Sequence, residues 1–138
     1  MAAYQKYTAA IESMLEGMNL GSDSWKVALS NTLNLADTTF TPGTTDLATG
    51  NGYTAGGNTC SVTSSSQTGG TYKLVLASPA VWTATGAGFT FRYAILWNAT
   101  TNQPVGAWDY GSPISLATGE TFTVKFSNTS PGAILTLA

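Results

Sequence analysis

The chain has 138 residues, and its composition excludes several classes of protein before any motif is considered. Hydrophobic residues make up 43% of it, which is too many for a chain that is disordered throughout. Charged residues make up only 9%, against roughly 25% in an average soluble protein, so hydroxyls, amides and glycine must cover much of the surface. The five basic residues are scattered along the chain, whereas a phosphate-binding stripe needs several together. We therefore expect no binding to nucleic acid.

Histidine is absent from the chain, and Cys60 is its single cysteine. The commonest general base and the commonest zinc ligand are therefore missing, and neither an intrachain disulfide nor a cysteine-based metal cluster can form. The N-terminus does not have the pattern of a secretory signal, and no apolar stretch approaches the roughly 20 residues that a membrane span needs. The sequence predicts a soluble protein made in a reducing compartment, with no cofactor, no metal and no membrane contact.

Residues 3–18 have the periodicity of an amphipathic helix. Gly17 or Gly21 can end this helix, because glycine adopts the left-handed capping conformation without strain. Two interpretations are open: the apolar face packs on the core of its own domain, or the helix is an arm that docks on a neighbouring subunit. The apolar residues recur at spacings of three and four, and they are Tyr4, Tyr7, Ile11, Met14, Leu15 and Met18.

After Gly21 the periodicity changes to that of a strand. Trp25, Val27 and Leu29 alternate with smaller or polar residues, as in a half-buried strand. Residues 34–58 then form a long segment without sustained periodicity, and compact domains rarely carry such loops without a use. Its two open interpretations are a solvated excursion and a contact loop that orders on a partner. As a contact loop, its candidate interface residues are Thr44, Asn51 and Tyr53.

From residue 59 onward the pattern is that of short β-strands separated by Gly, Pro or Asn. Residues 88–97 form the longest alternation, with Phe91 and Ile95 among five large residues of one parity, and we expect a central strand with one face in the core. Ser130-Pro131-Gly132 has the chemistry of a type II turn. The predicted strands are 59–65, 71–77, 80–84, 88–97, 105–110, 114–116, 121–127 and 133–137.

This order of elements predicts a mainly β fold, an antiparallel β-sandwich or jelly roll with an N-terminal α-helix. No compositional break marks a second domain. We expect an N-terminal helical element at residues 1–21 and a single β-sandwich domain at residues 22–138, with the loop 34–58 inside it.

The sequence contains few candidates for a catalytic or ligand-binding site. The glycines of Gly50–Gly57 have the wrong spacing for a dinucleotide loop, and the serines have no histidine base. Asp109 lies among aromatic residues in a predicted strand, either as a reactive carboxylate or, as we favour, as a solvent-facing residue or the ion-pair partner of Arg92 or a lysine. Three tryptophans could stack on a sugar, but burial in the core is the favoured interpretation; they are Trp82, Trp97 and Trp108. Cys60 is expected to be an inert small residue at a strand end.

Six segments, taken in order, resemble a family of small virion structural proteins of tailed bacteriophages and prophages. The resemblance extends over nearly the whole chain after residue 4 and includes no catalytic motif. It therefore implies a component of the virus particle. The segments are Leu20–Val27, Gly50–Gly57, Gly70–Leu76, Phe91–Asn98, Trp108–Ser112 and Gly119–Val124.

From this resemblance we expect a capsid decoration (cement) protein, made in the host cytoplasm and bound to the outer surface of the assembled head. Its partner would be the major capsid protein, and a closed cyclic homo-oligomer such as a trimer would be a natural arrangement. The helix and the loop 34–58 are the candidate contact elements. The alternatives are a tail or head–tail connector component and a carbohydrate-binding or host-surface module. An enzyme ranks last and is not expected.

Overall fold

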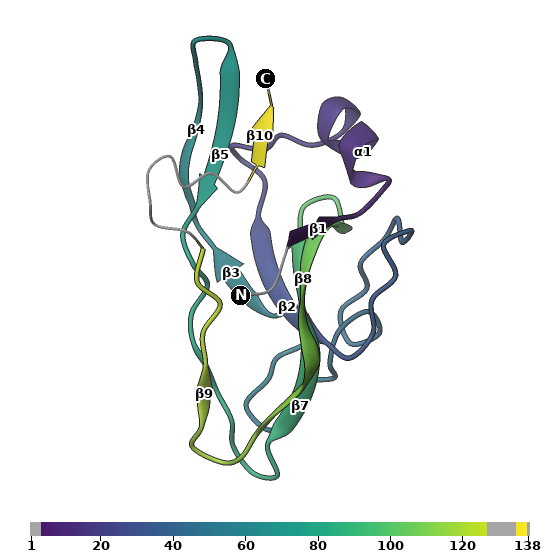
Figure 1. The fold of residues 1–138 in the computed structure, drawn as a ribbon, viewed down its shortest axis with the longest axis vertical. Coiled ribbons are helices and arrows are strands. Elements are labelled where there is room, and N and C mark those ends of the chain that lie inside the picture. The colour runs from purple at the N-terminus through teal and green to yellow at the C-terminus, as the bar shows by residue number, and fades with distance from the viewer. Residues whose placement is uncertain (1–3, 127–134, 138) are drawn as a thin grey trace.

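Within residues 4–126 and 135–137, which the computed structural model describes, the chain forms three antiparallel sheets and one short helix (Figure 1). This confirms the prediction of a mainly β, antiparallel fold. The finer assignment to a sandwich or jelly roll stays a prediction. The elements are β1 (Tyr4–Lys6), α1 (Ala10–Glu16), β2 (Trp25–Ser30), β3 (Asn58–Cys60), β4 (Val62–Thr68), β5 (Thr71–Leu76), β6 (Trp82–Thr83), β7 (Phe89–Asn98), β8 (Gln103–Leu116), β9 (Thr121–Phe122) and β10 (Leu135–Leu137).

The largest sheet has five strands in the order β1-β8-β7-β2-β3. A second sheet has the order β10-β5-β4, and β6 pairs with β9 in a two-stranded ladder. One buried cluster contains residues from all three sheets, among them Val27 of β2, Leu74 of β5 and Trp82 of β6. The sheets therefore share a single hydrophobic core.

The helix predicted over residues 3–18 is wrong at both ends. Tyr4–Lys6 is a strand that pairs with β8, with Tyr4 opposite Trp108, and the helix itself covers only Ala10–Glu16. The strand is possible because Gly106 leaves room for the tyrosine ring: a Cβ at Gly106 would lie 2.1 Å from Tyr4 Cε2. The helix ends at Gly17, whose amide donates to the Ser13 carbonyl at 2.8 Å.

Several predicted strand boundaries also differ from the structure. The predicted strands 105–110 and 114–116 are one continuous strand, β8, and its Pro113 lies between Asp109 and Ile114, where the register with β7 shifts, a position at which a strand tolerates proline. The predicted strand 59–65 is two strands, β3 and β4, which belong to different sheets. The predicted turn at 130–132 lies outside the described residues, and β10 lies within the predicted strand 133–137.

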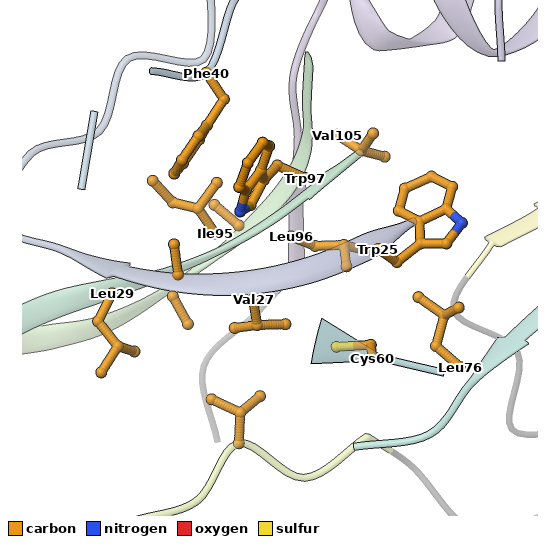
Figure 2. Packing of buried hydrophobic residues seen from close by; sticks show 14 of the residues in the cluster. Trp25, Val27, Leu29, Phe40, Cys60, Leu76, Ile95, Leu96, Trp97 and Val105 are labelled. Carbon is orange, nitrogen blue, oxygen red and sulfur yellow. The ribbon is translucent and has the colours of Figure 1, made fainter. Parts of the chain in front are cut away.

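Both faces of the central strands are buried, although the sequence predicted one buried face for β2 and β7. Val27 and Leu29 lie on one side of the sheet with Leu76, whereas Trp97 lies on the other side with Phe40 (Figure 2). The rings of Phe40 and Trp97 stack with centroids 4.1 Å apart. The second face is buried because the long loop, residues 34–57, covers it.

The long loop lies along the part of β2 that β3 leaves unpaired. β3 pairs only with Trp25–Val27, so the backbone of Leu29 lacks a strand partner on that side. The loop supplies one: the Leu47 amide donates to the Leu29 carbonyl at 3.0 Å, and the Tyr53 hydroxyl accepts from the Leu29 amide at 3.0 Å. Buried backbone groups need such partners, so the loop is not a solvated excursion.

The closest approach of the long loop to β2 is at Gly57, and it gives a test of this packing. Gly57 has φ +77°, and a Cβ there would lie 1.9 Å from the Val27 carbonyl oxygen. Gly70, in the β4–β5 turn, has a similar φ of +86° with nothing within 4 Å of such a Cβ. Gly70→Ala should therefore cost about 1 kcal/mol from backbone strain alone. Gly57→Ala should cost at least about 3 kcal/mol, because the loop must also move off the strand.

Urea denaturation of the two alanine variants and the parent chain measures both free energies of unfolding. Equal losses at Gly57 and Gly70 would contradict the close packing of the loop on β2.

Candidate interaction surface

The N-terminal segment presents apolar side chains to solvent while it is fixed to the body of the protein. Ile11 is 43% and Leu15 66% exposed, one helical turn apart on α1. Tyr7 is fully buried, and its amide donates to the Val105 carbonyl at 3.0 Å. Gln103 of β8 donates to the Ser13 hydroxyl at 2.7 Å, which ties the helix to the sheet.

The six candidate interface residues of this segment therefore divide into exposed and packed groups. Tyr4 is 40% exposed and makes an edge-to-face contact with Trp108, with ring centroids 5.4 Å apart. Met14 and Met18 are partly buried against the core. Tyr7 belongs to the core and contributes nothing to an outer surface. The packing of Tyr7, Met14 and Met18 confirms the interpretation that this segment packs on its own domain. Ile11 and Leu15 remain exposed.

The three candidates in the long loop also divide. Thr44 and Asn51 are exposed, and Asn51 lies in a tight turn with φ +54°, bracketed by the hydrogen-bonded pair Gly50 and Tyr53. Tyr53 is only 2% exposed, so the structure removes it from the candidate interface.

Asp46 organises the long loop, and sequence reasoning assigned it no such role. Its carboxylate is 7% exposed and accepts hydrogen bonds from the Gly43 amide at 2.6 Å, the Gly56 amide at 2.6 Å and the Tyr53 hydroxyl at 2.5 Å. Because Tyr53 in turn bonds the Leu29 amide, the carboxylate is connected to β2 through one side chain. Its three donors come together only in the folded loop, so the sequence carries no local signal of this role.

The other carboxylates described in strands and turns also have structural partners. Asp109 forms a two-pronged ion pair with Arg92, at 2.8 and 3.1 Å, which confirms the favoured interpretation. The hydrogen bond from Arg92 holds the pKa of Asp109 below its usual range. Asp23 accepts hydrogen bonds from the Asn98 side chain at 2.8 Å and from the Asn19 amide at 2.9 Å.

The tryptophans lie mostly in the core, as the favoured interpretation predicted. Trp82 and Trp97 are 2% and 3% exposed, and the Trp97 indole donates to the Gly56 carbonyl at 2.9 Å. Trp108 is half-buried between Tyr4 and Phe126. Cys60 is also buried, and burial raises the pKa of its thiol to about 12, consistent with an inert residue.

A shallow cleft of about 410 Å³ lies between α1, the long loop and the start of β8. Glu12 and Glu16 lie on its helical side, and Thr38 and Gln103 lie opposite. The cleft therefore presents two carboxylates next to the exposed apolar pair Ile11 and Leu15.

Among the described residues there is neither a membrane-spanning helix nor a cluster of metal-binding side chains. α1 has seven residues, and no helix in the described ranges has the length and hydropathy needed to cross a bilayer. Across 4–126 and 135–137, no three side chains of metal-binding type lie together.

Comparison of the chain with protein-family models, with curated protein sequences and with solved structures found no match in any of the three. The resemblance to virion structural proteins stays a prediction from the sequence.

Replacement of Asp46 by asparagine tests its role in the loop. An amide in place of the carboxylate would turn its NH₂ group toward the Gly43 or the Gly56 amide and leave a buried donor unpaired. We expect Asp46→Asn to lower the free energy of unfolding by about 2–4 kcal/mol. Asp109→Asn is the matched control, and its effect should be much smaller because that ion pair is partly open to solvent. Similar losses in both variants, measured by denaturation, would contradict the assignment.

The buried phenols and thiol predict a loss of stability at alkaline pH. Burial raises the pKa of Cys60 to about 12, from an ordinary value of 9.0, and raises the pKa values of Tyr7 and Tyr53 above their ordinary value of 10.0. The folded state therefore keeps protons that the unfolded chain releases, and the free energy of unfolding decreases as pH rises through the ordinary values.

Denaturation at successive pH values should show a plateau that ends near pH 9, followed by a steepening decline. Cys60→Ala should move the start of the decline toward pH 10, since the thiol has the lowest ordinary value. A flat profile up to pH 11 would show that these groups are not buried in solution.

Proposed function

We propose that this chain is a bacteriophage virion structural protein, a capsid decoration (cement) protein that binds the outside of the assembled head. The proposal starts from the ordered resemblance of six segments to virion structural proteins. As a second part of the proposal, the sheets pack face to face as a β-sandwich. The hydrophobic core that the three sheets share supports this arrangement.

The observation that carries the proposal is the exposed apolar pair on a segment that is already ordered. Ile11 and Leu15 face solvent, whereas Tyr7 and Ala10, from the same short segment, are buried in the core. Binding through an ordered segment avoids the entropy cost of fixing a loose arm. We propose that this pair, together with Tyr4 and the neighbouring carboxylates Glu12 and Glu16, contacts the major capsid protein.

The composition of the surface is consistent with a passive structural role. Only 9% of the residues are charged, so contacts would depend on hydroxyl and amide hydrogen bonds and on apolar burial, which salt screens little. Each copy that bridges neighbouring shell subunits would stabilise the assembled state by mass action. A homo-oligomer on the capsid surface, such as a trimer, is part of the same proposal.

Counting copies of the chain per particle tests the proposal and separates it from its main alternative. Quantitative mass spectrometry of purified particles should give a number comparable to that of the major capsid protein. A small, ring-sized number would place the chain at the tail or connector instead, and absence from purified particles would overturn every virion assignment. The carbohydrate-binding alternative is less favoured, because Trp82 and Trp97 are buried.

Substitution of the exposed leucine tests the contact surface. Leu15→Glu should weaken binding to shells that lack the chain at least tenfold, because it places a charge in the apolar contact beside Glu12 and Glu16. Its stability should be nearly unchanged, since Leu15 is 66% exposed. Val81→Glu, at a 50% exposed valine before β6, is the matched control and should bind normally. Co-sedimentation with empty shells measures both variants, and equal binding would contradict the proposed surface.

A further inference from the structure

β4 is the longest edge strand of the described structure. β4 (Val62–Thr68) is the last strand in the order β10-β5-β4, and all its residues after Val62 are exposed. Together with β5 it forms a hairpin whose tip extends away from the body (Figure 1). Its outward backbone groups are therefore accessible to another extended strand, which is the usual mode of strand addition to a sheet.

The edge strands of the five-stranded sheet have features that hinder such pairing. β1 and β3 have only three residues each, and β1 contains Lys6. The outer part of β8 beyond β1 contains Pro113, which cannot donate to a ladder. Proline, lysine and short length are the common means by which proteins protect an edge. β4 has seven residues with neither a charge nor a proline, and its one irregularity, between Val62 and Ser64, leaves Ser64–Thr68 regular.

The side chains of β4 identify a second copy of the same strand as the partner. We propose that two copies of the chain associate through antiparallel pairing of their β4 strands about a two-fold axis at Ser65. In this register Ser64 of one copy lies opposite Ser66 of the other, within the regular part of the strand. Small hydroxyl side chains in opposite positions form favourable cross-strand pairs, and no like charges meet.

The contacts inside β4 are compatible with this pairing. The Ser65 hydroxyl bonds the Tyr72 hydroxyl of β5 at 2.8 Å, and β4 and β5 keep one register from Ser64 to Thr68. The strand therefore pairs regularly with its own sheet over Ser64–Thr68, and a second copy would pair with its opposite edge. The product is a continuous six-stranded sheet of the form β10-β5-β4-β4-β5-β10. The association is a two-fold dimer and does not depend on the proposed function.

Sedimentation velocity of the full chain over a range of concentrations tests the inference. The parent chain should shift from 14.3 kDa toward twice that mass as concentration rises. In Ser64→Lys/Ser66→Lys, lysines from the two copies would face each other, and the dissociation constant should increase at least tenfold. The control Ser112→Lys/Thr121→Lys has the same net charge, with both lysines on exposed strand positions of other sheets, and should dimerise like the parent.

A charge-reversed pair tests the antiparallel register. Ser64→Glu/Ser66→Glu should be monomeric alone but should form a mixed dimer with Ser64→Lys/Ser66→Lys, since position 64 of one copy faces position 66 of the other. Circular dichroism checks that each variant is folded. If a variant does not fold, hydrogen exchange of the parent chain replaces it: the amides of 62–68 should become more protected at concentrations where the dimer forms.

Three results would overturn the inference. The parent chain could be monomeric at every concentration, the lysine pair on β4 could have no more effect than the control pair, or exchange over 62–68 could be independent of concentration.

Discussion

The hydrogen bonds from Asp46 through Tyr53 to Leu29 are the interaction on which the rest of the structure depends. β3 is too short to cover the edge of β2, so the backbone of Leu29 would be buried without a partner. The long loop resolves this by folding onto that edge, and the Asp46 carboxylate holds the loop in shape. One buried carboxylate with three hydrogen-bond donors thus allows a polar segment without regular secondary structure to cover the second face of the central sheet.

Much of the fold could be predicted from the sequence, because β-strands leave a strong local signal. The alternation at Trp25–Leu29 and the aromatic run from Phe89 place the two central strands correctly, and an ion pair with Arg92 or a lysine was one of the roles predicted for Asp109. The limits of the prediction follow from long-range packing. Tyr4 and Tyr7 have helical spacing to Ile11, yet Tyr4 lies in a strand, because Gly106, about a hundred residues later, provides the space for its ring.

The candidate surface was predictable only in part, for a similar reason. Periodicity groups apolar residues on one face of an element, but it does not show which of them the rest of the protein covers. Tyr7 is buried and Leu15 is exposed, although both lie on the same short segment. The role of Asp46 depends on three donors that the loop brings together only after it has folded. The Ser- and Thr-rich composition of β4 was visible in the sequence, whereas its position at a sheet edge depends on the topology.

The pairing of β1 with β8 also has a consequence for the order in which the chain folds. β1 and α1 leave the ribosome well before their partners near residues 103–108, and the Ser13–Gln103 hydrogen bond spans 90 positions. Contacts this distant in sequence form slowly, because a long loop must close before they contribute. During synthesis Tyr7 therefore stays exposed, and β1 stays unpaired, until β8 has emerged. A nascent chain is most open to chaperones or to misassembly with a neighbour during this interval.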